Sequence, residues 1–195
     1  DLLLLRELTR DWFADIPVYV STRGAVYPPA DYLLLCPLYG WAPRSIDRWF
    51  YALVTALVTA ALVAILVREA KPASRADRML LGALVVGGYP TAISLGNGQI
   101  TPHVLLTAIA AVLIALRRPP ALRRDLALAG LSLFALVKPN LTVPFFWVIA
   151  FRPGWTRPAA FALLGYLAVS ALAIALHGTG LDAVRELVAS WYHKG

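Results

Sequence analysis

Long apolar runs bounded by charged residues are the feature that most constrains this chain. The clearest run is Trp49–Val67, and others cover Met79–Leu95, Thr101–Leu116, Leu126–Phe151 and Pro158–His177. A helix needs about 20 apolar residues to cross about 30 Å of hydrocarbon. Because lipid cannot satisfy free backbone amides and carbonyls, such segments are helices or backbone buried in protein. The pattern predicts an all-α fold, a polytopic integral membrane bundle of helices.

The composition excludes other classes of protein. Of the 195 residues, 59% are hydrophobic and 15% are charged, whereas a soluble domain carries about 25% charged residues. Disordered chains are polar and rich in charge, so disorder is excluded as well. The single cysteine, Cys36, excludes an internal disulfide and a metal cluster built on thiolates. We expect no cofactor in this chain.

The net charge of +7 is confined to three connecting segments. These segments carry ten basic and three acidic residues, and the charges of the remaining residues balance. Their basic residues are Arg68, Lys71, Arg75 and Arg78, then Arg117, Arg118, Arg123 and Arg124, and then Arg152 and Arg157. The positive-inside rule places such segments on the cytoplasmic side of the membrane. The charge therefore indicates topology, and no nucleic acid partner is expected.

This orientation divides the chain into three parts. Residues 1–48 form an extracytoplasmic loop, in which Ala30–Trp41 is predicted to be a helix near the membrane interface. Residues 49–177 form the transmembrane bundle, and residues 178–195 form an extracytoplasmic amphipathic segment. In that last segment one helical face is apolar, and it consists of Leu181, Val184, Leu187, Val188 and Trp191. We expect this helix to lie across the outer mouth of a cavity.

The run Leu126–Phe151 is interrupted near its middle by Lys138-Pro139-Asn140. Proline lacks the amide that a continuous helix uses. The segments before and after this run are both expected inside, so the run enters the membrane and returns. Twelve residues of helix rise only about 18 Å. The apex is therefore predicted to stop within membrane depth, where it is buried in protein or lines a cavity.

Polar residues that are not topology signals gather on the outer side. They are the six acidic residues of the first segment, Tyr27, Asn97, Gln99, His103, Lys138 and Asn140. Polar groups at membrane depth are costly and often mark a functional site. The pattern predicts an outward-facing cavity, with carboxylates above it, amides and a hydroxyl at one rim and a cation at its floor.

Each of these residues also has a purely structural interpretation. Lys138 fits an anchor that extends to the outer headgroups. Asn97 and Gln99 lie among glycines and fit a tight turn. Tyr27 precedes two prolines, which favour an extended lead-in to the next helix. His103 fits a cap or packing group at a helix start, and most of the six acidic residues fit a solvated face.

Five short motifs occur in an order that resembles a known family. They are Asp1-Leu2, Pro17-Val18-Tyr19, Tyr27-Pro28-Pro29, Gly98-Gln99 and Leu136-Val137-Lys138-Pro139. Their order and spacing resemble glycosyltransferase family 87, whose members are polyprenol-phosphate-mannose-dependent mannosyltransferases of the GT-C superfamily. Members often carry Asn where this chain has Thr101. They are also longer, so we expect this chain to be a fragment that lacks helices at both ends.

The resemblance implies a membrane glycosyltransferase that moves mannose from a polyprenyl-phosphate donor to a hydroxyl of a lipid or glycan acceptor on the extracytoplasmic side. The transfer inverts the anomeric carbon and uses no metal ion. Asp1 then acts as the general base, and Lys138 binds the departing phosphate. The other residues expected to bind the substrates are Gln99, Asn97, Tyr27 and Asn140.

Two other functions are compatible with an outward-facing polar cavity. A transporter or flippase would use the cavity for passage, but such proteins commonly show internal repeats and broken helices in matching halves. One broken helix and no repeat are visible in this sequence, which favours the enzyme. A noncatalytic membrane subunit would leave the outer polar cluster without a purpose.

Overall fold

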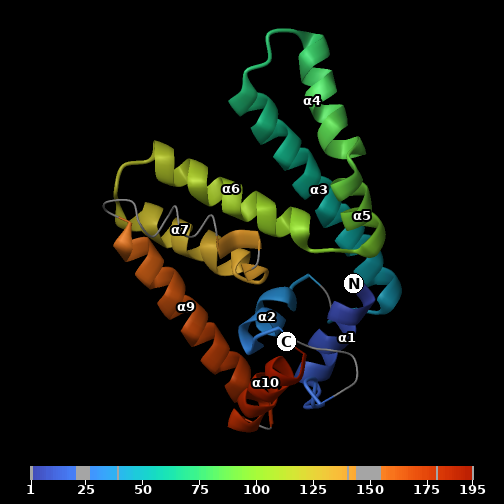
Figure 1. Cartoon of the computed structure of the whole chain (residues 1–195), viewed down its shortest axis with the longest axis vertical. Helices are drawn as coiled ribbons and strands as arrows, with labels where there is room; N and C mark the ends of the chain where they lie inside the picture. The colour runs from blue at the N-terminus through green and yellow to red at the C-terminus, as the bar shows by residue number, and fades with distance from the viewer. Residues whose placement is uncertain are drawn as a thin grey trace.

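The computed structural model describes residues 2–20, 27–38, 40–139, 141–143, 155–178 and 180–194. These residues form helices and turns without strands, so the predicted all-α fold is confirmed (Figure 1). The helices are α1 (Leu2–Phe13), α2 (Pro29–Leu35), α3 (Arg44–Ala70), α4 (Arg75–Gly87), α5 (Tyr89–Asn97), α6 (Thr101–Arg117), α7 (Leu122–Ala135), α9 (Thr156–Ala175) and α10 (Leu181–Lys194).

Three helical segments in the described part of the chain are long and apolar enough to cross a membrane. They are α3, the consecutive pair α4 and α5, and α9. Helix α3 contains the whole run Trp49–Val67, and α9 contains nearly all of Pro158–His177, so both runs are confirmed as helices. Helix α6 matches the predicted run 101–116 but is a shorter apolar helix. It packs against α7, which packs in turn against α9 (Figure 1).

The predicted span Met79–Leu95 lies within Arg75–Asn97, which is long and apolar enough to cross a membrane, but Gly88 divides it into α4 and α5. Gly88 has an extended backbone, with φ −64° and ψ 142°. Pro90 lies in the first turn of α5, where its missing amide is tolerated and where its ring disfavours helix just before it. The Thr91 hydroxyl donates to the Val85 carbonyl at 2.5 Å, which satisfies a carbonyl freed by the break. The helices therefore contain a second break that the sequence analysis missed.

The predicted interruption at Lys138 is confirmed. Helix α7 ends at Ala135, and the backbone then turns. The Thr142 hydroxyl donates to the carbonyl of Ala135 at 2.9 Å and lies 3.2 Å from that of Lys138. These contacts satisfy carbonyls that the helix end leaves free. The returning limb of this segment, residues 144–154, lies outside the described residues.

Ion pairs join the three basic segments at one end of the bundle. Arg117, at the end of α6, pairs with Glu69, at the end of α3. Asp125, near the start of α7, pairs with Arg124 at 3.0 Å and also with Arg157, at the start of α9. The chain has therefore returned to the start of α7 by the time α9 begins. The described residues of the three segments therefore lie close together, and their position on the cytoplasmic side stays a prediction.

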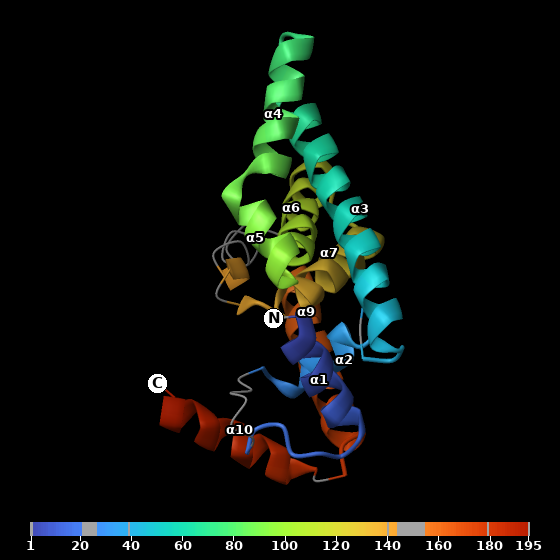
Figure 2. The ribbon, with the colours of Figure 1, turned by 90° about the vertical axis from the view of Figure 1, so that its right-hand side faces the viewer.

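Helices α1, α2 and α10 form the opposite end of the molecule (Figures 1 and 2). Trp12 of α1 stacks on Tyr32 of α2, with ring centroids 4.9 Å apart. Leu187 of α10 joins the same buried cluster. The amphipathic helix predicted near the end of the chain is confirmed, but it packs on α1 and lines neither of the two cavities described below.

The predicted helix Ala30–Trp41 is longer than the helix that the structure contains. Helix α2 spans only seven residues, starts at a proline and packs against α9. Its residues Ala30, Tyr32 and Leu35 are completely buried, so they contact protein. The position of this helix near the membrane interface stays a prediction.

Asp31 lies in this buried layer, although the acidic residues of the first segment were predicted to be mostly solvated. Its Oδ1 accepts a hydrogen bond from the Tyr166 hydroxyl of α9 at 3.0 Å. Among the described residues, its Oδ2 has no hydrogen-bond partner. Burial raises the pKa of Asp31 well above its usual value, because the charged form loses its hydration. The neutral, protonated carboxyl is therefore favoured.

We expect Asp31→Asn to remove a pH dependence of folding stability. A carboxyl whose pKa is raised in the folded state binds its proton more tightly there, so the free energy of unfolding falls as pH rises above the unfolded-state pKa of about 3.9. The fall approaches about 1.4 kcal/mol per pH unit until the folded-state pKa is passed. Thermal unfolding between about pH 5 and pH 8 measures this slope.

The matched control is Asp47→Asn. Asp47 is also buried, but its Oδ2 accepts a hydrogen bond from Arg6 Nε at 2.5 Å. Breaking this ion pair should lower the unfolding temperature at every pH, because it leaves a buried charge poorly compensated. Equal pH slopes in the wild type and Asp31→Asn would contradict the prediction.

Candidate functional site

Two of the predicted site residues meet through a third residue at the start of α6. Lys138 Nζ donates a hydrogen bond to Thr101 Oγ1 at 2.9 Å. The Thr101 hydroxyl in turn lies 3.5 Å from Gln99 Oε1. The structure thus brings the ammonium of Lys138 and the amide of Gln99 to the same hydroxyl, although their positions are far apart in the sequence.

The turn between α5 and α6 fixes this arrangement. Gly98 ends α5 with φ +65°, a conformation that favours glycine. The backbone N–H of Gln99 then donates to the Ser94 carbonyl at 2.8 Å, which closes the helix end. The backbone carbonyl of Gln99 accepts a hydrogen bond from the Tyr51 hydroxyl at 2.7 Å. The turn is therefore held both to its own helix and to α3.

Helix α1 begins directly against this turn. A Cβ atom added to Gly98 would overlap Leu2 Cβ and would lie 3.2 Å from the Leu2 backbone nitrogen. Asp1 itself lies outside the described residues. Its neighbour Leu2 lines the same cavity as Asn97, so the Asp-Leu and Gly-Gln motifs come together at one place.

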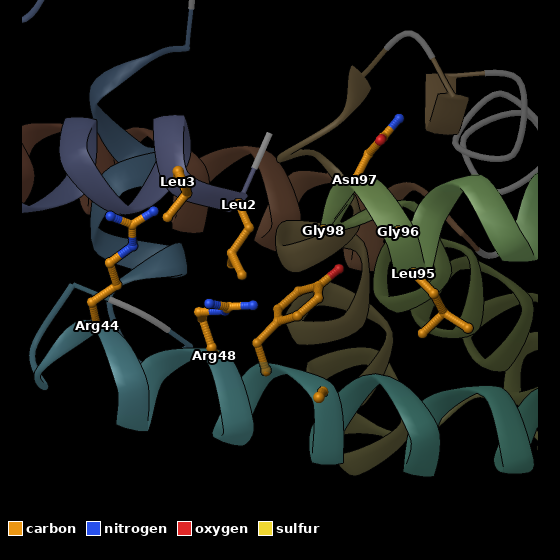
Figure 3. Close-up of a pocket in the computed structure, with 10 residues that line it drawn as sticks. Leu2, Leu3, Arg44, Arg48, Leu95, Gly96, Asn97 and Gly98 are labelled. Carbon is orange, nitrogen blue, oxygen red and sulfur yellow. The ribbon is translucent and has the colours of Figure 1, made fainter.

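The first cavity of the site, which we call the arginine cavity, has a volume of about 520 Å³ and lies between α1, α3 and the end of α5. Arg44 and Arg48 line it on the α3 side, and residues 95–98 line it on the α5 side. Figure 3 shows both arginine side chains extending from α3 into the space below α1, whereas the Asn97 side chain points away from them.

The second cavity, which we call the apolar groove, has a volume of about 290 Å³ and lies between α3, α4, α5 and α6. Along α6 its lining residues run from Thr101 to Ile109. Leu84 and Leu105 line it and are also exposed, so the groove is open at the surface of these helices. Thr101, which accepts the hydrogen bond from Lys138, is one of the residues that line the groove.

The remaining predicted residues are less closely grouped. Tyr27 is half-buried between the two core clusters that contain Tyr32 and Ile100, and burial raises the pKa of its hydroxyl. Asn97 is exposed at the rim of the arginine cavity. Asn140 lies outside the described residues. The predicted roles of these residues in substrate binding stay predictions.

His103 and the acidic residues do not form a metal centre in the described part of the chain. His103 is buried beside Tyr51, with ring centroids 5.6 Å apart, which supports its interpretation as a packing group. No group of three or more His, Cys, Asp or Glu among the described residues is placed to hold a metal ion.

The sequence analysis missed Arg44 and Arg48, and the sequence did contain a signal for them. Both precede the predicted span Trp49–Val67 on its outer side, where the positive-inside rule predicts few arginines. Thr101 was noted only as a departure from a motif, yet it is the direct partner of Lys138.

The fold and the site define an integral membrane protein of several helices. Its polar site lies at the turn between α5 and α6, and Thr101 of this site also lines the apolar groove. The sequence profile of glycosyltransferase family 87 matches residues 25–194. The chain belongs to this family, and it is therefore a membrane glycosyltransferase with a sugar donor and an acceptor. The match confirms the resemblance and favours the enzyme over the transporter and the noncatalytic subunit. No curated protein and no solved structure matches the chain.

We expect Gly98→Ala to reduce transfer strongly. A Cβ atom at this position overlaps Leu2, and a left-handed backbone costs a non-glycine residue roughly 1–2 kcal/mol. The start of α1 would have to move, and the neighbouring Asp1 with it. Gly96→Ala is the matched control, because no atom lies within 4 Å of a Cβ added there. Turnover in purified protein measures the effect, and equal turnover in the two variants would contradict it.

Proposed function

We propose that this glycosyltransferase transfers mannose from a polyprenyl-phosphate donor to a hydroxyl of a lipid or glycan acceptor, on the extracytoplasmic side, with inversion and without a metal ion. The observation that carries the proposal is a junction at Thr101, which lines the apolar groove and accepts a hydrogen bond from Lys138. A polyprenyl-phosphate sugar has an apolar tail and an anionic head, and this junction offers a matching surface to each.

The apolar groove suits the donor's lipid chain for a physical reason. Six of its lining residues are leucine, isoleucine or valine, and small residues such as Gly88, Thr91 and Ser94 complete the walls. A chain that enters from lipid exchanges one apolar environment for another, so it enters without a large loss of hydration. The polar head then determines where the donor stops.

Lys138 suits the donor's phosphate. Its ammonium carries three N–H donors, and the structure gives it one protein acceptor, Thr101 Oγ1, among the described residues. An ammonium at this depth is costly unless water or an anion meets it. As the sugar leaves, negative charge grows on the phosphate, and a cation placed in advance stabilises that charge.

The proposed reaction is a single displacement. Asp1 accepts the proton of the acceptor hydroxyl as its oxygen forms a bond to the anomeric carbon. The bond between the anomeric carbon and the phosphate oxygen breaks, and its electron pair stays on the lipid phosphate beside Lys138. Gln99, Asn97, Tyr27 and Asn140 are proposed to bind the sugar and acceptor hydroxyls. Attack from the face opposite the phosphate inverts the anomeric carbon.

Asp1→Asn tests the proposed general base. The amide keeps the shape of the carboxylate but cannot accept a proton at neutral pH, so turnover should fall by about 10²- to 10⁴-fold while the donor still binds. The rival carboxylates are Asp11 and Asp15. Asp15 accepts a hydrogen bond from the Gly178 amide at 2.6 Å, so a structural role accounts for it. Normal turnover in Asp1→Asn with loss in Asp11→Asn would identify a different base.

Lys138→Gln tests the phosphate contact. Hydrogen bonds to charged groups contribute about 1.5–3 kcal/mol, so donor affinity should fall about tenfold or more, and turnover with it. Lys138→Arg should restore only part of the loss, because a planar guanidinium does not fit the position of a compact ammonium. Lys71→Gln is the control, since Lys71 is exposed at the turn after α3. A headgroup anchor would instead tolerate both substitutions at Lys138.

A further inference from the structure

Four of the described residues that line the apolar groove carry a hydroxyl. They are Thr59, Thr91, Ser94 and Thr101. The Thr59 and Thr91 hydroxyls each donate to a backbone carbonyl, at 2.8 Å and 2.5 Å. The Thr101 hydroxyl accepts a hydrogen bond from Lys138 Nζ at 2.9 Å. Three of these four hydroxyls therefore have a partner in the protein.

The Ser94 hydroxyl differs from the other three. Ser94 is only 5% exposed, and its hydroxyl has no hydrogen-bond partner among the described residues. Its Oγ atom is not fully enclosed, so a ligand in the groove can reach it. Buried polar side chains nearly always have a hydrogen-bond partner, and one without a partner requires an explanation. A ligand that accepts a hydrogen bond from Ser94 would supply it.

Ser94 lies at the same end of the groove as Thr101. Its backbone carbonyl accepts a hydrogen bond from the Gln99 N–H at 2.8 Å, which holds Ser94 against the turn that leads to Thr101. From Thr101 the groove follows α6 to Ile109, about 12 Å further along the helix by its rise. A ligand whose tail lies along α6 therefore carries its head beside Ser94 and Lys138.

A phosphate oxygen is the acceptor that suits this hydroxyl best. A polyprenyl chain has no hydrogen-bond acceptor, so a tail placed against Ser94 would leave the hydroxyl proton unsatisfied. A phosphate oxygen is charged, and hydrogen bonds to charged acceptors are roughly twice as strong as neutral ones. The ammonium of Lys138 favours an anion at the same end of the groove.

We infer that Ser94 is a further donor-binding residue, whose hydroxyl donates a hydrogen bond to a phosphate oxygen of the polyprenyl-phosphate sugar. This inference rests on the proposed function, in which Lys138 holds the same phosphate. The phosphate is then held from two elements, by the ammonium after α7 and by the hydroxyl of α5. An ammonium is a compact point charge with rotatable N–H donors, so it does not orient a phosphate by itself. The second contact, from a helix, fixes that orientation.

The test measures binding, so it does not depend on transfer. The full chain is purified in a neutral detergent and titrated with farnesyl phosphate, farnesol and inorganic phosphate. Ser94→Ala should weaken the binding of farnesyl phosphate about tenfold, because a hydrogen bond to a charged group is lost. It should leave the binding of farnesol nearly unchanged. Ser94→Thr, which keeps the hydroxyl, should restore most of the affinity for farnesyl phosphate.

The matched control is Thr59→Val, which removes another hydroxyl from the same groove. The Thr59 hydroxyl already donates to the Thr55 carbonyl, so its loss should leave the affinity for farnesyl phosphate unchanged. Lys138→Gln provides the comparison with the proposed function. If both residues contact one phosphate, the double variant of Ser94→Ala and Lys138→Gln should lose less affinity than the two single losses combined.

The outcomes separate this inference from the proposed function. Normal affinity for farnesyl phosphate in Ser94→Ala, with loss in Lys138→Gln, would overturn the inference and leave the proposed function intact. Loss in Ser94→Ala with normal affinity in Lys138→Gln would support the serine contact and overturn the phosphate role of Lys138.

Two further outcomes would overturn the inference. An equal loss of farnesol and farnesyl phosphate in Ser94→Ala would show that the residue only shapes the groove. Displacement of farnesyl phosphate by an equal concentration of inorganic phosphate would identify a site for a free anion rather than for a lipid phosphate.

Discussion

The close approach of Leu2 to Gly98 is the contact on which the geometry of the site depends. It joins the start of α1 to the turn between α5 and α6, and only a residue without a Cβ atom permits it. The Tyr51 hydroxyl holds the same turn to α3 through the Gln99 carbonyl. Three elements from distant parts of the sequence therefore meet at one short turn. The two cavities lie on either side of it, and each takes part of its wall from α3 and α5.

Properties that depend on local sequence were predicted well. Hydropathy and charge identified the spans that became α3 and α9, and Pro139 with Lys138 identified the end of α7. Those signals follow from the cost of placing charge and free backbone groups in lipid. The break at Gly88 was missed because a glycine followed by a tyrosine and a proline within an apolar run is also compatible with a continuous membrane helix, which tolerates such residues.

Properties that depend on distant packing could not be predicted. Asp31 was grouped with the solvated acidic residues, because nothing near it in the sequence shows that α9 covers it and supplies the Tyr166 hydroxyl. The same limit applies to Lys138 and Thr101, which are 37 positions apart. A threonine hydroxyl accepts a hydrogen bond from an ammonium as an asparagine carbonyl would. Thr101 therefore gives Lys138 a hydrogen-bond acceptor at the position where the chain departs from the family pattern.

The basic residues differ in their partners, and this difference distinguishes those that hold helices together from Lys138 at the site. Arg124 and Arg157 both pair with the carboxylate of Asp125. These ion pairs hold α7 to α9, so the two arginines stabilise the fold. Near the turn at Gly98 the pattern is reversed, because the partner of Lys138 among the described residues is the hydroxyl of Thr101. An ammonium in a membrane protein is costly unless water or an anion meets it. In the proposed function the donor phosphate supplies this anion when the donor binds, so the ammonium is neutralised in the complex.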